Sequence, residues 1–197
     1  MACSRTSRAL CAASLLLLPI SAVQAQVTTF FAYLSQEGAL PTTGTGTVFV
    51  TLDQTLGTMR VQASFSGLVG TTLAAHIHCC TVTPLTGNAG VATETPSFTG
   101  FPLGVTSGTF DNTFNMTLSS SYNPSFITAF GGTVPSALAG LSAGMFAGRT
   151  YFNVHTTYAA GGEIRGYLQA VPEPTTYALM AAGLLALGVV ARRRRPV

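Results

Sequence analysis

The chain has 197 residues, of which only 8% are charged, and all nine of its basic residues are arginines. Six arginines lie at the two ends, so residues 26–170 hold three arginines against five acidic residues. A nucleic-acid-binding domain needs a basic face on its folded part. The composition therefore excludes nucleic acid as a partner.

The first 25 residues have the pattern of a secretory signal peptide. Two arginines form its positive start, an apolar run covers residues 9–18, and Pro19 ends that run. Small residues follow and predict a cut by signal peptidase after Ala25. The alternative is an uncleaved membrane anchor, but the apolar run is too short to span a bilayer.

Residues 26–170 are predicted to form one domain of short strands, because apolar and polar residues alternate along them. The predicted inward rows are Val48, Val50 and Leu52; Met59, Val61, Ala63 and Phe65; Leu73, Ala75, Ile77 and Cys79; Phe110, Phe114, Met116 and Leu118; and Phe152, Val154, Ile164 and Leu168. Residues 123–148 predict a long connection with a short helix near 136–141. The pattern favours an all-β fold, an antiparallel Greek-key sandwich.

Two adjacent cysteines, Cys79 and Cys80, remain once the predicted signal peptide is removed. Neighbouring cysteines cannot crosslink distant segments of the chain. They can form a ring with each other, pair outside the chain or bind a metal. The hydrophobic core must therefore hold the domain together.

Residues 171–197 have the pattern of a second targeting segment, at the C-terminus. Pro172, Glu173 and Pro174 end the domain, because prolines so spaced do not continue a strand. The uncharged stretch 175–191 predicts a transmembrane helix of about 25 Å. The arginine cluster that would hold its end in the cytoplasm comprises Arg192, Arg193, Arg194 and Arg195. An ordinary tail anchor is the alternative.

The order of Pro-Glu-Pro, one apolar helix and an arginine cluster resembles the PEP-CTERM sorting signal of Gram-negative bacteria. The resemblance implies that the helix is a transient handle in the inner membrane, cut near the Pro-Glu-Pro by an exosortase. The processed protein would then reach the cell surface or the extracellular matrix. PEP-CTERM proteins are associated with exopolysaccharide and biofilm.

The three histidines of the chain lie in predicted strands. His76 and His78 are two residues apart, so their side chains share the face opposite Ala75 and Ile77. His155 lies on the polar face of a later strand. One interpretation is a copper or zinc site in which His76 and His78 chelate the ion, with His155 or a thiolate of Cys79 or Cys80 as further ligands.

The other interpretation is a polar network that stabilises strand pairing. If Val154 pairs with Ile164, the register places His155 opposite Glu163. The predicted network comprises Asn153, His155, Glu163 and Arg165. No nucleophile with a base partner is evident in the sequence, so the domain is expected not to be an enzyme. Metal-dependent redox activity is the alternative.

Three segments, 74–78, 90–92 and 151–168, resemble the CHRD domain over residues 28–169. They contain Ala-Ala-His-Ile-His, Gly-Val-Ala, and Tyr-Phe-Asn-Val-His-Thr followed by Gly-Gly-Glu-Ile-Arg-Gly-Tyr-Leu. The resemblance implies an immunoglobulin-like all-β fold and a non-catalytic binding or scaffolding role toward exopolysaccharide or surface proteins. The histidine pair is also similar to the copper-binding strand of Cu/Zn superoxide dismutase. The adjacent cysteines depart from the small polar residues expected of the family at 79–80.

Overall fold

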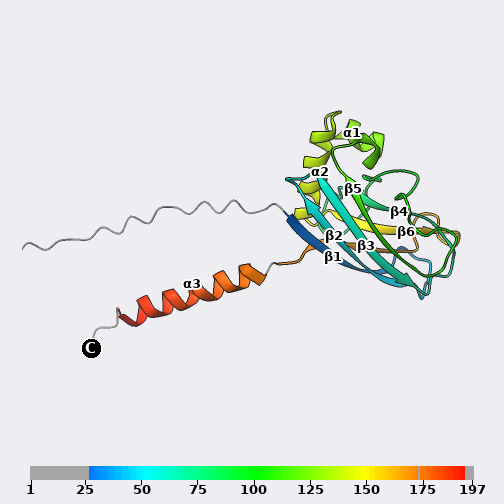
Figure 1. Ribbon diagram of the computed structural model, residues 1–197. Coiled ribbons are helices and arrows are strands. Elements are labelled where there is room, and N and C mark those ends of the chain that lie inside the picture. The colour runs from blue at the N-terminus through cyan, green and yellow to red at the C-terminus, as the bar shows by residue number, and fades with distance from the viewer. Residues whose placement is uncertain (1–26, 173, 194–197) are drawn as a thin grey trace, which may run out of the picture.

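The computed structural model describes residues 27–172 and 174–193. The predicted signal peptide with its cleavage point at Ala25, together with Glu173, Arg194 and Arg195, lies outside the described residues. Figure 1 shows a β domain with two helices, α1 and α2, near one end of its sheet, and a further helix, α3, that follows the domain.

Eight strands and four helical segments make up the described part of the chain. The strands are β1 (Val27–Gln36), β2 (Thr45–Asp53), β3 (Thr58–Ser66), β4 (Thr72–Cys79), β5 (Gly108–Asn115), β6 (Thr150–Thr156), β7 (Ile164–Tyr167) and β8 (Gln169–Ala170). The helical segments are the 3₁₀ helix η1 (Ser119–Ser121), α1 (Pro124–Ala129), α2 (Val134–Phe146) and α3 (Pro174–Arg193).

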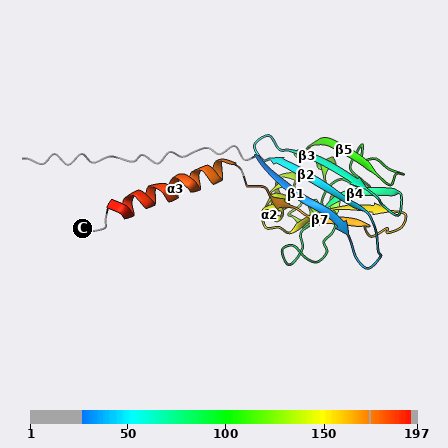
Figure 2. The ribbon, with the colours of Figure 1, turned by 90° about the horizontal axis from the view of Figure 1, so that it is seen from below.

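All strand pairs are antiparallel, in the order β4-β6-β7-β1-β2-β3-β5, with β8 also paired to β1. The all-β prediction is confirmed. The strands form one sheet curved into a half-barrel, in place of two separate sheets of a Greek-key sandwich (Figure 2). The reason lies in β1, which pairs with β2 along most of its length and with β7 at its end, through Ser35 and Gln36.

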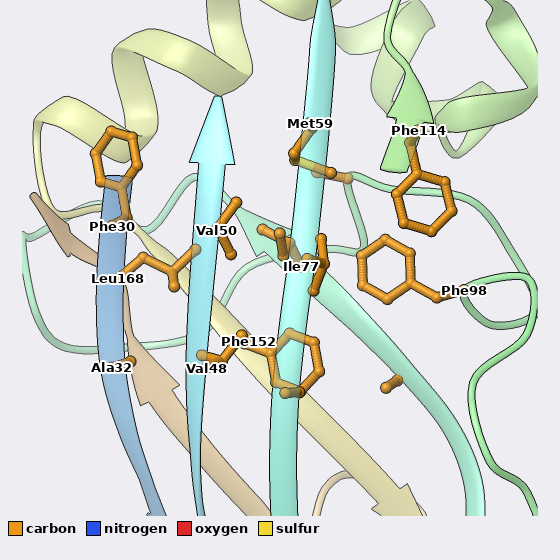
Figure 3. Close-up of a cluster of buried hydrophobic side chains, with 14 of the residues drawn as sticks. Phe30, Ala32, Val48, Val50, Met59, Ile77, Phe98, Phe114, Phe152 and Leu168 are labelled. Atoms are coloured by element: carbon orange, nitrogen blue, oxygen red, sulfur yellow. The ribbon is translucent and has the colours of Figure 1, made fainter. Parts of the chain in front are cut away.

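The two halves of the curved sheet face each other across one core, which keeps the fold sandwich-like. Figure 3 shows Val48, Val50 and Met59 from one half beside Ile77 and Phe152 from the other. All five side chains are fully buried. This burial is the main favourable free-energy contribution to the fold, about 1.5–3 kcal/mol for each large apolar side chain.

Two predicted core residues are exposed instead. Leu73 is 50% exposed, because a bulge between Thr72 and Ala74 interrupts the alternation of β4. Leu118 is 52% exposed and lies beyond Asn115, the end of β5.

The core also contains Phe98, which the alternation pattern did not predict because it lies in a loop. That loop covers the gap between the edge strands β4 and β5. Its amide at Phe98 donates to the carbonyl of Ala75 (3.1 Å), and the amide of Thr72 donates to that of Val105 (2.9 Å). Backbone groups on the free edge of β4 therefore find hydrogen-bond partners in this loop, in place of a neighbouring strand.

Helix α2 extends beyond the predicted helix at 136–141 in both directions. Thr133 caps it through a reciprocal pair of hydrogen bonds with Ser136. Helix α3 covers the stretch predicted to cross a membrane. Among the described residues, however, no helix combines the length and the apolar character that a membrane crossing requires, so the predicted transmembrane helix is not supported.

Candidate metal centre

The candidate site lies on the outer face of β4 and β6, opposite the core. Because Ala75 and Ile77 point inward, His76 and His78 must point outward. This outer face is nevertheless covered by the chain that follows β4. His76 is only 6% exposed and His78 only 7%. The third histidine, His155, is half-buried.

Pairing of β4 with β6 brings the three histidines together, as the metal interpretation requires. The ring centroids lie 5.1 Å apart for His76 and His155, 5.7 Å for His78 and His155, and 5.9 Å for His76 and His78. Each ring offers one nitrogen, and the three nitrogens lie within 4.8 Å of one another.

Each imidazole is oriented by a hydrogen bond to a backbone carbonyl of a surrounding loop. The bonds join His76 Nε2 to Pro96 O (2.6 Å), His78 Nδ1 to Ala89 O (2.9 Å) and His155 Nδ1 to Ala160 O (2.9 Å). A carbonyl oxygen only accepts, so the bonded ring nitrogen carries the proton. In a neutral ring the other nitrogen is then a lone-pair donor.

The nitrogens left over are His76 Nδ1, His78 Nε2 and His155 Nε2. All three are buried and have no hydrogen-bond partner among the described residues. Burial lowers the pKa of His76 and of His78 to about 4, and it also lowers the pKa of His155. The cluster thus consists of three neutral imidazoles, each with one buried lone pair that is free. A ring whose second N–H is held by a carbonyl is the usual state of a metal-ligating histidine.

The cysteines do not join this cluster. Cys79 and Cys80 form a disulfide with each other, the first of the pairings open to neighbouring cysteines. They pack against α2, with Cys80 Sγ 3.8 Å from the carbonyl oxygen of Gly140. A Cβ on Gly144 would lie 2.5 Å from both sulfurs, so this glycine lets the helix approach the disulfide.

The predicted polar network divides into two parts. The register is as predicted, with Val154 opposite Ile164 and Asn153 opposite Arg165. The carboxylate of Glu163, however, lies away from the histidines and accepts four hydrogen bonds. Its donors are Thr42 Oγ1 (2.5 Å), Val69 N (2.6 Å), Thr156 Oγ1 (2.7 Å) and Gly70 N (3.1 Å). Burial alone would raise the pKa of Glu163, but these bonds outweigh burial and lower it.

Glu37, which the sequence did not predict as a member of the network, is the carboxylate that lies beside Arg165. Arg165 Nη1 lies 3.1 Å from Glu37 Oε1, in a pair that is largely shielded from solvent. Burial raises the pKa of Glu37 although Arg165 opposes that shift. The Arg165 guanidinium also lies 4.9 Å from the ring of Tyr151, which stacks on His78 at 4.7 Å. Sequence reasoning missed Glu37 because it lies just past β1, far along the chain from its partner.

Two family models match the chain in adjoining regions. The CHRD domain model matches residues 30–168, which include the whole histidine cluster. The chain belongs to the CHRD domain family. The PEP-CTERM protein-sorting motif matches residues 170–195, directly after the CHRD domain. No curated protein and no solved structure matches the chain.

The sorting motif implies that this CHRD protein is processed by an exosortase, exported and placed at the cell surface of a bacterium. Within the motif, the side chains of Pro172 and Arg192 are exposed in the structure.

Proposed function

We propose that this CHRD protein binds one copper or zinc ion through His76, His78 and His155. The proposal rests on two observations about these rings: one nitrogen from each lies within 4.8 Å of one nitrogen from the others, and each ring has a buried nitrogen without a hydrogen-bond partner among the described residues. A buried polar atom without a partner costs about 1–3 kcal/mol. A metal ion satisfies all three nitrogens at once, and imidazole suits both copper and zinc.

The hydrogen bonds that orient the three rings support the same proposal. The carbonyls of Ala89, Pro96 and Ala160 come from the two connections around the site and hold each ring in one orientation. Such outer partners fix the tautomer and make the ligating nitrogen more basic. We propose a binding module without catalysis of its own, and redox turnover of bound copper is the alternative to be tested.

Metal analysis of the exported protein tests the proposal. The protein is purified without a histidine tag, and its metal content is measured by inductively coupled plasma mass spectrometry. About one copper or zinc per chain is expected. The double variant His76→Gln/His78→Gln should lose the metal. The control Cys79→Ser/Cys80→Ser should keep it, because the sulfurs lie on the core side. Folded, metal-free wild-type protein would contradict the proposal.

We also propose that the domain associates with matrix exopolysaccharide, in a biofilm of a Gram-negative bacterium that exports the protein through its inner membrane. The observation that favours a polysaccharide is an aromatic cluster on the outer face of β1 and β2. Phe31 contacts Tyr33 and Phe49 at ring-centroid distances of 4.7 and 4.8 Å. Tyr33 is 75% exposed and Phe49 is 44% exposed. Exposed aromatic groups that gather in this way mark interaction surfaces.

A shallow groove of about 430 Å³ lies beside this cluster, lined by Phe49 together with hydroxyl, amide and carboxylate groups. Its lining includes Thr47, Gln62, Thr109 and Asp111. Flat rings beside polar groups suit sugar rings, which present both apolar faces and hydroxyls. Co-sedimentation with purified exopolysaccharide should weaken in Tyr33→Ala/Phe49→Ala and not in the control Leu56→Ala, a residue that is 70% exposed. If Tyr33→Ala/Phe49→Ala binds the polysaccharide as well as Leu56→Ala does, the aromatic cluster is not the binding surface.

A further inference from the structure

We infer that the metal of this site is copper(I), held by the three histidine nitrogens alone. The inference rests on the proposed metal binding and specifies which ion the site selects. Its starting point is the number of protein ligands. Among the described residues, no cysteine, aspartate or glutamate joins His76, His78 and His155 within ligand distance.

Of the other polar groups on this face, the Tyr151 hydroxyl and the Asn153 amide nitrogen make hydrogen bonds, whereas Asn153 Oδ1 and Glu37 Oε2 are buried without a partner among the described residues. The hydroxyl of Tyr151 donates to the carbonyl of Ala89 (3.2 Å). The amide of Asn153 lies against Gly162, next to the carboxylate of Glu37. The carboxylate of Glu37 in turn faces Arg165. Among the histidine, cysteine and carboxylate side chains of the described residues, only the three imidazoles form a ligand cluster here, and they offer three nitrogens.

Solvent does not reach the ligating atoms either. The three free nitrogens are buried, and the loops whose carbonyls hold the rings also cover them. Zinc with three protein ligands takes a water as its fourth ligand and keeps that position open. A closed site with three nitrogens does not match this coordination preference of zinc. Copper(I), a closed-shell monovalent ion, is stable at low coordination number.

The charges around the site also favour copper(I). All three ligands are neutral, and a cation lies close to them: Arg165 lies over the ring of Tyr151, which stacks on His78. Glu37 is already paired with that arginine. The cost of burying an ion rises with the square of its charge, so a divalent ion costs about four times as much as a monovalent one. A site without an anionic ligand therefore favours the monovalent ion.

The distances allow this coordination after a small adjustment. Three nitrogens about 2.0 Å from a metal in one plane lie about 3.5 Å from one another. In the structure the three nitrogens are separated by up to 4.8 Å, so the rings must move together by up to roughly an ångström when the metal binds. His155 is the least buried of the three and lies next to the turn that leads to β7, which leaves it room to move.

X-ray absorption spectroscopy of the exported protein tests the inference directly. The protein is loaded anaerobically with copper(I), or separately with zinc(II), and ligands are counted from the fine structure. Three nitrogens and no oxygen around copper(I) are expected. In chelator competition, copper(I) should bind at least about 1,000-fold more tightly than zinc(II), and His155→Gln should weaken copper(I) binding at least about 100-fold. The Cys79→Ser/Cys80→Ser variant should bind like the wild type.

The outcomes separate this inference from the proposed function. Tighter binding of zinc(II), four-coordinate with a water, would overturn the choice of copper(I) and leave the three-histidine site in place. Folded protein that takes up neither ion would overturn both. If His155→Gln fails to fold, as judged by circular dichroism, the count of nitrogens around copper(I) in the wild type decides.

Discussion

Replacement of Glu163 by glutamine should strongly destabilise the domain, because this carboxylate joins four separate groups of the structure. It accepts hydrogen bonds from the hydroxyls of Thr42 and Thr156 and from the backbone amides of Val69 and Gly70. The residue is 1% exposed, so water cannot replace these partners. One carboxylate thereby ties the β1–β2 and β3–β4 connections to the end of β6.

The expected loss follows from the geometry. A glutamine keeps one acceptor oxygen, and its amide group must face the other pair of donors. A hydroxyl can turn around to accept, but the backbone N–H of Gly70 cannot. One buried N–H without a partner costs about 1–3 kcal/mol, and bonds to a charged group exceed neutral ones by about 1 kcal/mol each. The free energy of unfolding of Glu163→Gln should therefore fall by about 3 kcal/mol.

Urea unfolding followed by tyrosine fluorescence measures this loss. In a thermal scan the midpoint should fall by about 6–12 °C. The matched control is Glu94→Gln, whose carboxylate makes one exposed hydrogen bond to Thr99 (2.5 Å) and should change stability by less than about 0.5 kcal/mol. A loss below about 1 kcal/mol for Glu163→Gln would refute the reasoning.

The same carboxylate predicts a dependence on pH. The pKa of Glu163 is lower in the folded state than its ordinary value of 4.5. Its contribution to stability is therefore complete above that value and is lost as the pH falls through the lower folded pKa. The gap between wild type and Glu163→Gln should narrow below about pH 4.5. A gap that stays constant down to pH 2.5 would show that the carboxylate charge is not involved.

Three further substitutions test the packing, each measured by urea unfolding. Phe98→Ala should cost about 3–5 kcal/mol, because this loop side chain is 2% exposed and stacks among core rings; a cost near 1 kcal/mol would place it outside the core. Gly144→Val should cost about 1–3 kcal/mol, since its side chain would collide with the disulfide, and stability equal to wild type would contradict that contact. Asp111→Asn should leave the stability close to that of the wild type, although Arg60 lies 2.6 Å away, because that pair is exposed; a clear loss of stability would show that the exposed ion pair matters.

Local patterns in the sequence determined much of this protein. Alternation with a period of two identified the strands and the face that each side chain takes, because neighbouring side chains in a strand point to opposite sides. This placed His76 and His78 on one face. A short connection likewise made the register of Val154 with Ile164 predictable. The sorting motif was readable because it is a contiguous stretch of chain.

Only the tertiary structure decided which of these faces meet. His155 reaches His76 because β4 pairs with β6, a pairing between segments that lie far apart in the chain. For the same reason, only the tertiary structure showed that Glu37 meets Arg165 and that Phe98 enters the core. Side-chain direction follows from backbone geometry one residue at a time, whereas the choice of strand partner follows from the packing of the whole core. The bulge that exposes Leu73 and the pairing of β1 with both β2 and β7, which bends the sheet, likewise depend on the packing of the whole core.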